Sequence, residues 1–173
     1  RVKVGDNWID CDVVLWATGV AASPLGKALR IEVDKAGRAF VEKDLSIKGY
    51  PNIFVIGDMA SLKQENGEPV PGVSPAAMQM GTATAKNILN ELKGKPRENF
   101  AYWDKGTMAT IGRSKAIAQA AGFKFKGFIA WLMWLFLHVF FLIGFRNRLA
   151  VMVDWFWAYL TRERSARLIT GDA

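Results

Sequence analysis

The pattern of apolar and polar positions divides this chain into a mixed part, residues 1–126, and a strongly apolar part, residues 127–160. In the mixed part, residues 52–58 read Asn-Ile-Phe-Val-Ile-Gly-Asp, and their four consecutive apolar residues predict a strand buried on both faces. The strand should end at Gly57, with Asp58 next. An acceptor at the carboxyl end of a strand lies where open α/β sheets bind ligands, although an ordinary Gly-Asp turn has the same sequence.

The first twenty residues predict a hairpin that leads into another buried strand. Residues 2–4 and 8–9 flank a turn at residues 5–7. Residues 11–16 are mostly apolar and run into Ala-Thr-Gly, which ends at Gly19. Small residues there would allow a cofactor to approach the backbone, or would simply form a tight turn.

Shorter elements are predicted between these two strands and after them. Ser23-Pro24 is a favourable start for a short helix. Residues 31–34 and 39–41 predict short strands around a turn, and residues 61–73 predict a loop because they are polar and rich in Gly and Pro.

The clearest helical pattern covers residues 75–93. Ser74 is a good N-cap, Pro75 suits the first helical position, and Lys-Gly-Lys-Pro ends the pattern. The predicted N-terminus follows Asp58 by sixteen residues. Its free N–H groups and positive dipole end should therefore face whatever binds over the strand ends.

Residues 100–112 and 116–125 predict antiparallel strands of a small sheet, joined by a polar turn at residues 112–115. A second turn, at residues 104–106, carries the cation of Lys105 at its tip. A solvated turn lysine and a functional cation are equally compatible with that position.

Residues 127–145 contain no charged side chain, and nineteen such residues meet the length test for a transmembrane helix. A second apolar stretch, residues 149–160, carries Asp154. Cations flank the first stretch at both ends, so they give no orientation. Because aromatic residues are dispersed through it, we expect two helices embedded in one leaflet in preference to a spanning hairpin or a buried core helix.

Composition narrows the classes of function. Of the net charge of +7, most arises in residues 113–173, which hold nine basic and three acidic side chains. Basic charge beside apolar aromatics indicates an anionic membrane surface and not a nucleic acid. A single cysteine, Cys11, excludes an internal disulfide or a Cys-x-x-Cys pair, and one histidine argues against a metal site.

The start of the chain suggests a fragment. It begins at Arg1 without a signal peptide, and it contains no Gly-x-Gly-x-x-Gly or Walker loop. We therefore expect the pyrophosphate cradle of any dinucleotide site to lie upstream.

Five motifs occur together in one order. They are Val-Leu-Trp-Ala-Thr-Gly at 14–19, Asn-Ile-Phe-Val-Ile-Gly-Asp at 52–58, Ser-Pro-Ala-Ala-Met-Gln at 74–79, Asp-Lys-Gly-Thr-Met-Ala-Thr-Ile-Gly-Arg at 104–113 and Gly-Phe-Arg-Asn-Arg at 144–148. In that order they resemble the C-terminal part of a type II NADH:quinone oxidoreductase, the non-proton-pumping NADH dehydrogenase. The family belongs to the FAD/NAD(P)-binding pyridine nucleotide-disulfide oxidoreductases.

The resemblance implies an α/β fold: an incomplete flavoprotein with two Rossmann-like dinucleotide-binding domains, a small antiparallel sheet and C-terminal membrane-associated helices. Residues 1–37 would close the NADH domain and connect it onward, and residues 38–98 would belong to the FAD domain. Residues 99–126 would form the small β region, and residues 127–173 the anchoring helices and basic tail.

The resemblance also implies the chemistry: NADH reduces FAD, which reduces a membrane quinone. Asp58 would accept hydrogen bonds from the ribityl hydroxyls of FAD. The remaining cofactor-binding candidates are Gly19, Gly57, Ala76, Ala77, Met78, Lys105 and Gly106. Gln79 and Lys105 are the candidate catalytic residues: Gln79 would donate a hydrogen bond to a quinone carbonyl, and Lys105 would place a cation near the flavin ring or near the quinone. Ser74-Pro75 replaces the Ala-Gln that opens the family's Ala-Gln-x-Ala-x-Gln pattern, so one of two glutamines is absent.

The expected location is the cytoplasmic face of a bacterial inner membrane, with residues 127–160 on the bilayer surface and a homodimer left open. Two alternatives remain: another flavin-dependent pyridine-nucleotide oxidoreductase, and a non-enzymatic membrane-associated binding module. Disulfide reductases and sulfide:quinone oxidoreductases use cysteine pairs, and this chain has only Cys11.

Overall fold

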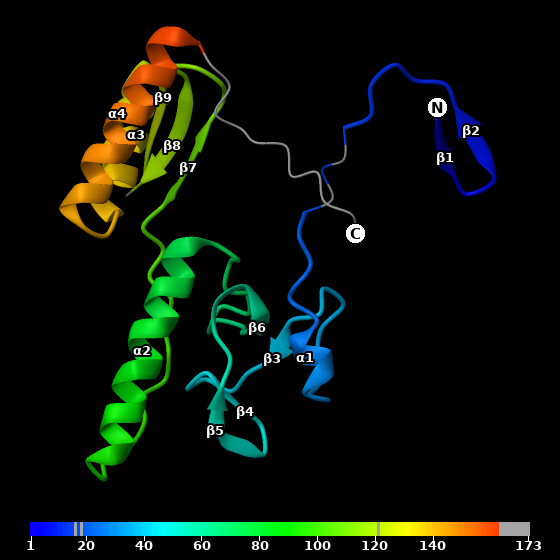
Figure 1. Ribbon diagram of the computed structural model, residues 1–173. Helices are drawn as coiled ribbons and strands as arrows, with labels where there is room; N and C mark the ends of the chain where they lie inside the picture. Colours follow the sequence, from blue (N-terminus) through cyan, green and yellow to red (C-terminus); the bar gives the residue numbers. More distant parts are fainter. Residues whose placement is uncertain (16, 18, 121, 163–173) are drawn as a thin grey trace. The chain divides into compact units, whose positions relative to one another are not determined.

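The computed structural model describes residues 1–15, 17, 19–120 and 122–162 (Figure 1). The chain divides into two compact units, Arg1–Asp104 and Lys105–Ala173, and each is described by itself. The first unit opens with the predicted hairpin, formed by β1 (Val2–Val4) and β2 (Asn7–Ile9) in antiparallel register. Gly5 adopts φ +60 in the turn, a conformation that glycine reaches without strain.

The second strand predicted in this region is wrong for the described residues 11–15, which form no strand. Val13 and Leu15 are 73% and 89% exposed. A strand is stable only when a neighbour satisfies its backbone groups, and no such neighbour pairs with this segment in the described part of the chain. Trp16 and Thr18 lie outside the described residues.

Short elements then form the middle of the first unit. They are α1 (Leu25–Ala28), β3 (Ala39–Phe40), β4 (Ser46–Ile47), β5 (Tyr50–Phe54), the 3-10 helix η1 (Gly57–Met59) and β6 (Ala60–Ser61). Strands β3 and β6 pair in parallel, whereas β4 and β5 pair antiparallel. The predicted helix after Ser23-Pro24 is confirmed, and a bridge between Val33 and Ala39 closes the turn predicted between them.

The strand predicted over residues 53–56 lies earlier and is less buried than expected. Strand β5 ends at Phe54, its first four residues are exposed, and Ile56 is 39% exposed. Only Val55, just after the strand, enters the core. A strand with one ladder partner in a two-stranded sheet has little to cover both of its faces, which explains the difference.

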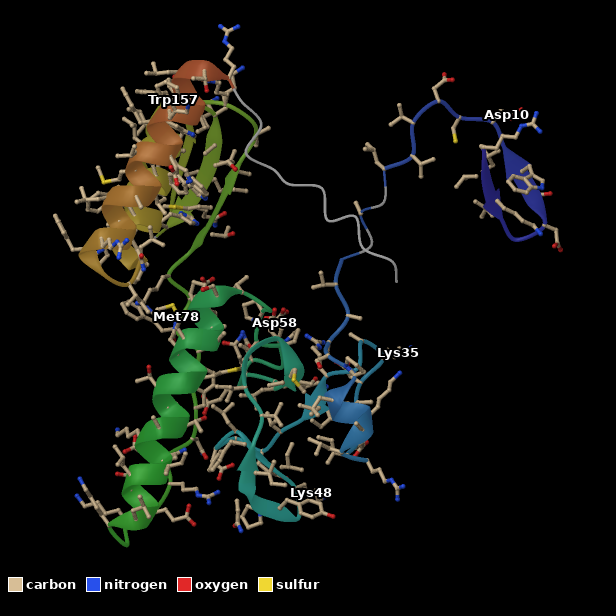
Figure 2. All side chains as sticks on the ribbon, in the orientation of Figure 1. Asp10, Lys35, Lys48, Asp58, Met78 and Trp157 are labelled. Atoms are coloured by element: carbon tan, nitrogen blue, oxygen red, sulfur yellow. The ribbon has the colours of Figure 1, made fainter. Side chains whose placement is uncertain are left out.

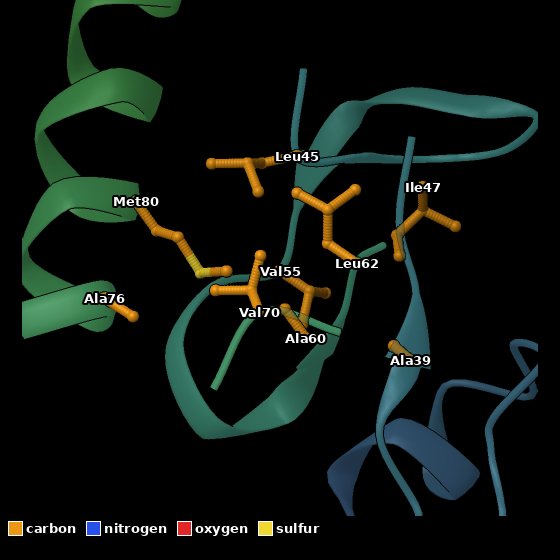
Figure 3. Packing of buried hydrophobic residues seen from close by; sticks show 9 residues of the cluster. All are labelled: Ala39, Leu45, Ile47, Val55, Ala60, Leu62, Val70, Ala76 and Met80. Atoms are coloured by element: carbon orange, nitrogen blue, oxygen red, sulfur yellow. The ribbon is translucent and has the colours of Figure 1, made fainter. Parts of the chain in front are cut away.

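The core of the first unit joins this strand region to a long helix, α2 (Ser74–Leu92). Figure 3 shows Met80 reaching from α2 toward Val55 and Val70. The cluster contains Ala39, Leu45, Ile47, Val55, Ala60, Leu62, Val70, Ala76 and Met80, all nearly inaccessible to solvent. This packing fixes the start of α2 beside η1.

The far half of α2 is held by polar contacts. Asn87 is 1% exposed, and its amide donates to the backbone oxygen of Glu98 at 2.9 Å and accepts from the backbone nitrogen of Glu98 at 2.8 Å. Arg97 donates to the carboxylate of Asp44 at 3.0 Å. These contacts fasten the segment after the helix to the helix itself and to the loop before β4.

The second unit contains an antiparallel sheet in the order β7 (Thr107–Thr110), β8 (Ala116–Ala120) and β9 (Phe123–Gly127). The predicted sheet is confirmed with a third strand, and its first strand begins at Thr107 instead of residue 100. Helix α3 (Phe128–Phe141) packs on this sheet. Ala116, Ala118 and Ala130 are buried at the contact, because small side chains let a helix approach a strand closely.

The apolar run of residues 127–145 is not one helix, because it divides between α3 and the start of α4 (Phe145–Thr161). Leu142 is extended, and Gly144 adopts φ +85. Arg148 donates to the carbonyl oxygens of Leu142 at 2.9 Å and Phe140 at 2.8 Å, which satisfies acceptors at the end of α3. The expected pair of helices is therefore present.

Within the described residues, we find no helix that combines the length and the hydropathy needed to cross a bilayer.

Candidate functional site

A small hollow lies where η1 meets the first turns of α2, and we call it the Asp58 hollow. Figure 2 shows Asp58 beside the start of α2. Its lining residues come from the turn before β3, from η1 and β6, from the loop before α2 and from α2 itself. They are Arg38, Gly57, Asp58, Ala60, Val70, Pro71, Gly72, Val73, Ala76, Ala77 and Met80. The structure thus brings together four predicted site residues: Gly57, Asp58, Ala76 and Ala77.

Gly57 is required by its backbone conformation. It adopts φ +65, which disfavours any residue with a Cβ. A Cβ there would lie 3.4 Å from the Cβ of Ala77, which is an ordinary van der Waals contact. The Gly57 backbone N–H points to the sulfur of Met80 at 3.2 Å, so this donor is used inside the fold. The positive φ, and not a lack of space, therefore calls for glycine at this position.

Asp58 is exposed at the mouth of the hollow, and within the described residues no hydrogen bond or ion pair engages its carboxylate. Gly72 faces it, because a Cβ built on Gly72 would lie 3.6 Å from Asp58 Oδ1. The carboxylate is thus held beside two glycines with its acceptor oxygens open. That arrangement suits a ligand with several hydroxyl groups.

The N-terminus of α2 also borders the hollow, but it is built differently from the prediction. Val73 occupies the cap position, Ser74 is the first helical residue, and no side chain caps the end. The expectation of Ser74 as N-cap is therefore wrong. The N–H groups of Ala76 and Ala77 already donate to the carbonyl oxygen of Val73, at 3.0 and 3.1 Å. What α2 contributes to the hollow is the positive end of its dipole.

Arg38 is a member of the hollow that the sequence analysis missed. Its Nε donates to Asp34 Oδ2 at 2.7 Å, and Asp34 Oδ1 accepts from the backbone N–H groups of Ala36 and Arg38. Burial acts to raise the pKa of Asp34, but these hydrogen bonds outweigh it and leave that pKa below its usual value. The sequence did contain one signal for this ion pair: Asp34 precedes Arg38 by four residues, with the turn glycine Gly37 between them.

Two predicted site residues on α2 have other surroundings. Gln79 pairs with the backbone of Trp103: its Nε2 donates to the carbonyl oxygen at 3.1 Å, and its Oε1 accepts from the nitrogen at 3.0 Å. Met78 is 54% exposed and does not line the hollow. Both remain predictions as quinone or flavin contacts.

Three further predicted site residues, like Met78 and Gln79, lie outside the hollow. Gly19 adopts φ +80, and no atom lies within 4 Å of a Cβ built there. Lys105 and Gly106 open the second unit. A Cβ on Gly106 would collide with the carbonyl oxygen of Gln119, so glycine is needed for this segment to pack against β8. The roles of all three with a cofactor remain predictions.

Two family models match the chain. The model of pyridine nucleotide-disulphide oxidoreductases matches residues 2–81, and the model of the NDH2 C-terminal domain matches residues 104–163. The first match contains Gly57 and Asp58, and the second contains Lys105 and helices α3 and α4.

Curated relatives agree with these matches. The type II NADH:quinone oxidoreductases NdhA and Ndh of Mycobacterium tuberculosis are 42% and 45% identical over 97% and 91% of this chain. The type II NADH:quinone oxidoreductase of Staphylococcus saprophyticus is 37% identical over 73% of it. The chain spans 37%, 35% and 32% of the length of these three relatives.

A solved structure shares the fold. NDH2 from Plasmodium falciparum, in complex with NADH, matches 83% of this chain and 44% of its own with a TM-score of 0.70 and 16% sequence identity. At that identity the match speaks for the fold alone. The two family models and the curated relatives together identify this chain as similar, over most of its length, to the C-terminal part of the type II NADH:quinone oxidoreductases, within the pyridine nucleotide-disulphide oxidoreductase superfamily.

Proposed function

We propose that this protein, as a whole, is an FAD-dependent NADH dehydrogenase that passes electrons from NADH to a membrane quinone without pumping protons. The relatives' names support the activity. The observation that carries the cofactor assignment is the Asp58 carboxylate, open at the mouth of a hollow beside two glycines and the start of α2. FAD, when bound, accepts a hydride from NADH and delivers two electrons to the quinone.

The residues of the hollow fit the polyol part of a flavin. In our proposal Asp58 accepts hydrogen bonds from ribityl hydroxyls, because a carboxylate has two acceptor oxygens and no donor at neutral pH. Gly57 and Gly72 keep Cβ atoms away from that carboxylate and from Ala77. A side chain at position 72 would restrict access to the acceptors of Asp58.

Helix α2 would act through its charge distribution. Its positive end would stabilise negative charge at the N1–C2=O edge of a reduced flavin. Ala76 and Ala77 suit this position, since small side chains permit a flat ring to approach the helix end. Met78 would add an apolar contact at the same end.

Gln79 and Lys105 are assigned to the quinone side. The Gln79 amide orders the backbone of Trp103 and would present that segment to a quinone carbonyl. The Lys105 cation would stabilise the reduced quinone or the reduced flavin. Gly106 would hold the Lys105 segment against β8. Gly19 would lie near the nicotinamide of NADH.

We assign the chain's parts accordingly: residues 1–37 to the end of the NADH domain and its connection, 38–98 to the Rossmann-like FAD domain, 99–126 to the small β region and 127–173 to the anchor. Helices α3 and α4 expose large apolar side chains such as Phe136, Phe140 and Trp157. Surfaces of this kind suit a lipid bilayer, and we place them on the cytoplasmic face of a bacterial inner membrane.

The experiment that tests this proposal uses the whole protein, purified from membranes. We expect flavin absorbance in the purified protein, oxidation of NADH with a soluble quinone acceptor, and no inhibition by inhibitors of the proton-pumping complex. Protein that folds but carries no flavin would contradict the proposal. Sedimentation of the same sample would decide whether the protein is a homodimer. In a separate experiment, deletion of residues 127–173 should move the protein from the membrane to the soluble fraction.

A further inference from the structure

Helices α3 and α4 form a large apolar groove that the proposed redox chemistry does not use. It encloses about 1060 Å³ and is lined by Arg113, Trp131, Leu132, Trp134, Leu135, Phe136, Val139, Met152, Trp155, Phe156, Ala158, Tyr159 and Arg162. Figure 2 shows Trp157 on α4, the helix that supplies one of its walls. No acidic side chain is among these residues, so the groove offers apolar surface with positive charge only.

Two aromatic pairs, one tilted and one stacked, connect the two walls of the groove. The rings of Trp131 and Tyr159 lie 5.7 Å apart, and those of Trp134 and Trp155 lie 5.5 Å apart. Because these pairs connect the start of α3 to the end of α4, the helices run antiparallel. Along α3 the lining extends from Trp131 to Val139, which is about 12 Å at 1.5 Å per residue. The lining therefore spans about two turns of α3.

Both cations of the groove lie at one end. The Arg113 guanidinium lies 4.2 Å above the Tyr159 ring, whose hydroxyl is 2.9 Å from Ser114 Oγ. Arg162 follows Tyr159 by three residues, one turn further along the chain, at the end of α4. Within the described residues, no acidic partner neutralises either arginine. The groove is thus cationic at the Tyr159 end and apolar at the end that contains Val139 and Met152.

Cations at the opposite end of the helix pair are not part of the groove. Arg148 donates to two carbonyl oxygens at the end of α3, and Arg146 is exposed outside the lining. The charge polarity of the groove therefore does not arise merely from a basic surface all around the two helices.

We propose that this groove binds a single anionic phospholipid, with its phosphate on Arg113 and Arg162 and an acyl chain along the aromatic wall between α3 and α4. Arginine suits phosphate because its planar guanidinium can donate two parallel hydrogen bonds. A neutral isoprenoid quinone could fill the apolar part but would leave both cations unmatched. The assignment goes beyond membrane association and does not depend on the redox activity.

The test uses the tryptophans that line the groove as reporters. The full chain, purified in a nonionic detergent, is titrated with phosphatidylglycerol whose acyl chains are brominated, because bromine quenches tryptophan fluorescence on contact. Phosphatidylcholine with the same brominated chains is the comparison. We expect saturable quenching by the anionic lipid at a concentration about tenfold lower, as one charge-assisted contact accounts for about that factor.

Two pairs of variants separate the headgroup from the chain. Replacing both groove cations, Arg113→Gln with Arg162→Gln, should remove the preference for the anionic lipid, whereas Arg146→Gln should leave it within about twofold. Ala158→Phe should block the groove and abolish the saturable quenching of the groove tryptophans by both lipids. Ala150→Phe adds the same side chain on α4 outside the lining and should not.

Four results would overturn the proposal. Equal quenching by the two lipids would show that the cations select nothing. An equal loss in Arg146→Gln would indicate general attraction to a charged surface. Displacement of the anionic lipid by lower concentrations of a neutral isoprenoid quinone would assign the groove to that tail. Absence of quenching in a sample that sedimentation shows to be self-associated would assign it to a second copy of the chain.

Discussion

The amide of Gln79 meets the backbone of Trp103 at both of its ends, donating to the carbonyl oxygen at 3.1 Å and accepting from the nitrogen at 3.0 Å. A glutamine on α2 thereby fixes a residue that lies just before Asp104, the last residue of the first unit. Any contact between Gln79 and a quinone would have to share an amide that already has two backbone partners. Substitutions at Gln79 can therefore report on two roles at once.

Gln79→Leu should lower the free energy of unfolding by about 1 kcal/mol, because two hydrogen bonds to a partly exposed backbone are lost. In the whole protein it should also raise the apparent KM for quinone and leave the KM for NADH unchanged. Urea unfolding and steady-state kinetics measure these effects. Gln64→Leu, the same change in a loop of the first unit, should alter neither Michaelis constant. Equal effects on both would reduce Gln79 to a structural residue.

Gly57→Ala should destabilise the protein by about 1–2 kcal/mol, because alanine is strained at φ +65. It should also reduce flavin occupancy, since backbone strain at residue 57 would displace the adjacent Asp58 carboxylate at the hollow. Gly67→Ala is the matched control: its φ is +81, and no atom lies within 4 Å of the new Cβ. It should cost similar stability with no loss of flavin. Equal flavin loss in both variants would contradict the role of Gly57 beside Asp58.

Asp44 should make the stability of the first unit sensitive to acid. Burial acts to raise the pKa of its carboxyl, but hydrogen bonds from Ser46 and from Arg97 outweigh burial and hold that pKa below its usual value of 3.8. The folded state thus favours the charged form. The resulting stabilisation is complete above the ordinary pKa and is lost as the pH falls through the lower, folded-state pKa.

Asp44→Asn should therefore lower stability at about pH 6 and narrow the difference in unfolding free energy between about pH 6 and about pH 3. Urea unfolding at the two pH values measures this. Asp10→Asn removes an exposed carboxylate that pairs with Arg1 and should leave the difference unchanged. A difference as wide in Asp44→Asn as in the unmodified protein would show that other groups control acid unfolding.

The sequence predicted the helical part of the fold better than the strands. Helix α2 could be placed within one residue, because the Ser-Pro start, the apolar spacing and the Lys-Gly-Lys-Pro stop all agree locally. Strands at residues 11–16 and 53–56 were predicted as buried, but burial of a strand depends on neighbours elsewhere in the chain. Val14 and Ile53 are 52% and 40% exposed, since the described residues supply no covering layer for them.

Parts of the candidate site followed from sequence for a related reason. Gly57, Asp58, Ala76 and Ala77 could be grouped because a strand end and a helix start meet in α/β folds. Arg38 could not be grouped with them, because only the fold brings the turn before β3 to the hollow. The partner of Gln79 was equally invisible, since it is a backbone segment with no residue-type signal.

The carboxylate of Asp58 provides the sharpest test of the flavin proposal. Asp58→Ala should weaken FAD binding by roughly 1.5–3 kcal/mol, about tenfold to a hundredfold in Kd, because desolvated hydroxyl donors lose a charged acceptor. Asp58→Asn keeps the shape and one acceptor oxygen, so its loss should be intermediate. The measurement is flavin retained by the whole protein at limiting FAD, with Glu65→Ala as an exposed carboxylate control. Equal flavin retention in all three variants would show that Asp58 does not contact the cofactor. A loss of flavin that is largest in Asp58→Ala, smaller in Asp58→Asn and absent in Glu65→Ala requires a charged acceptor at that position.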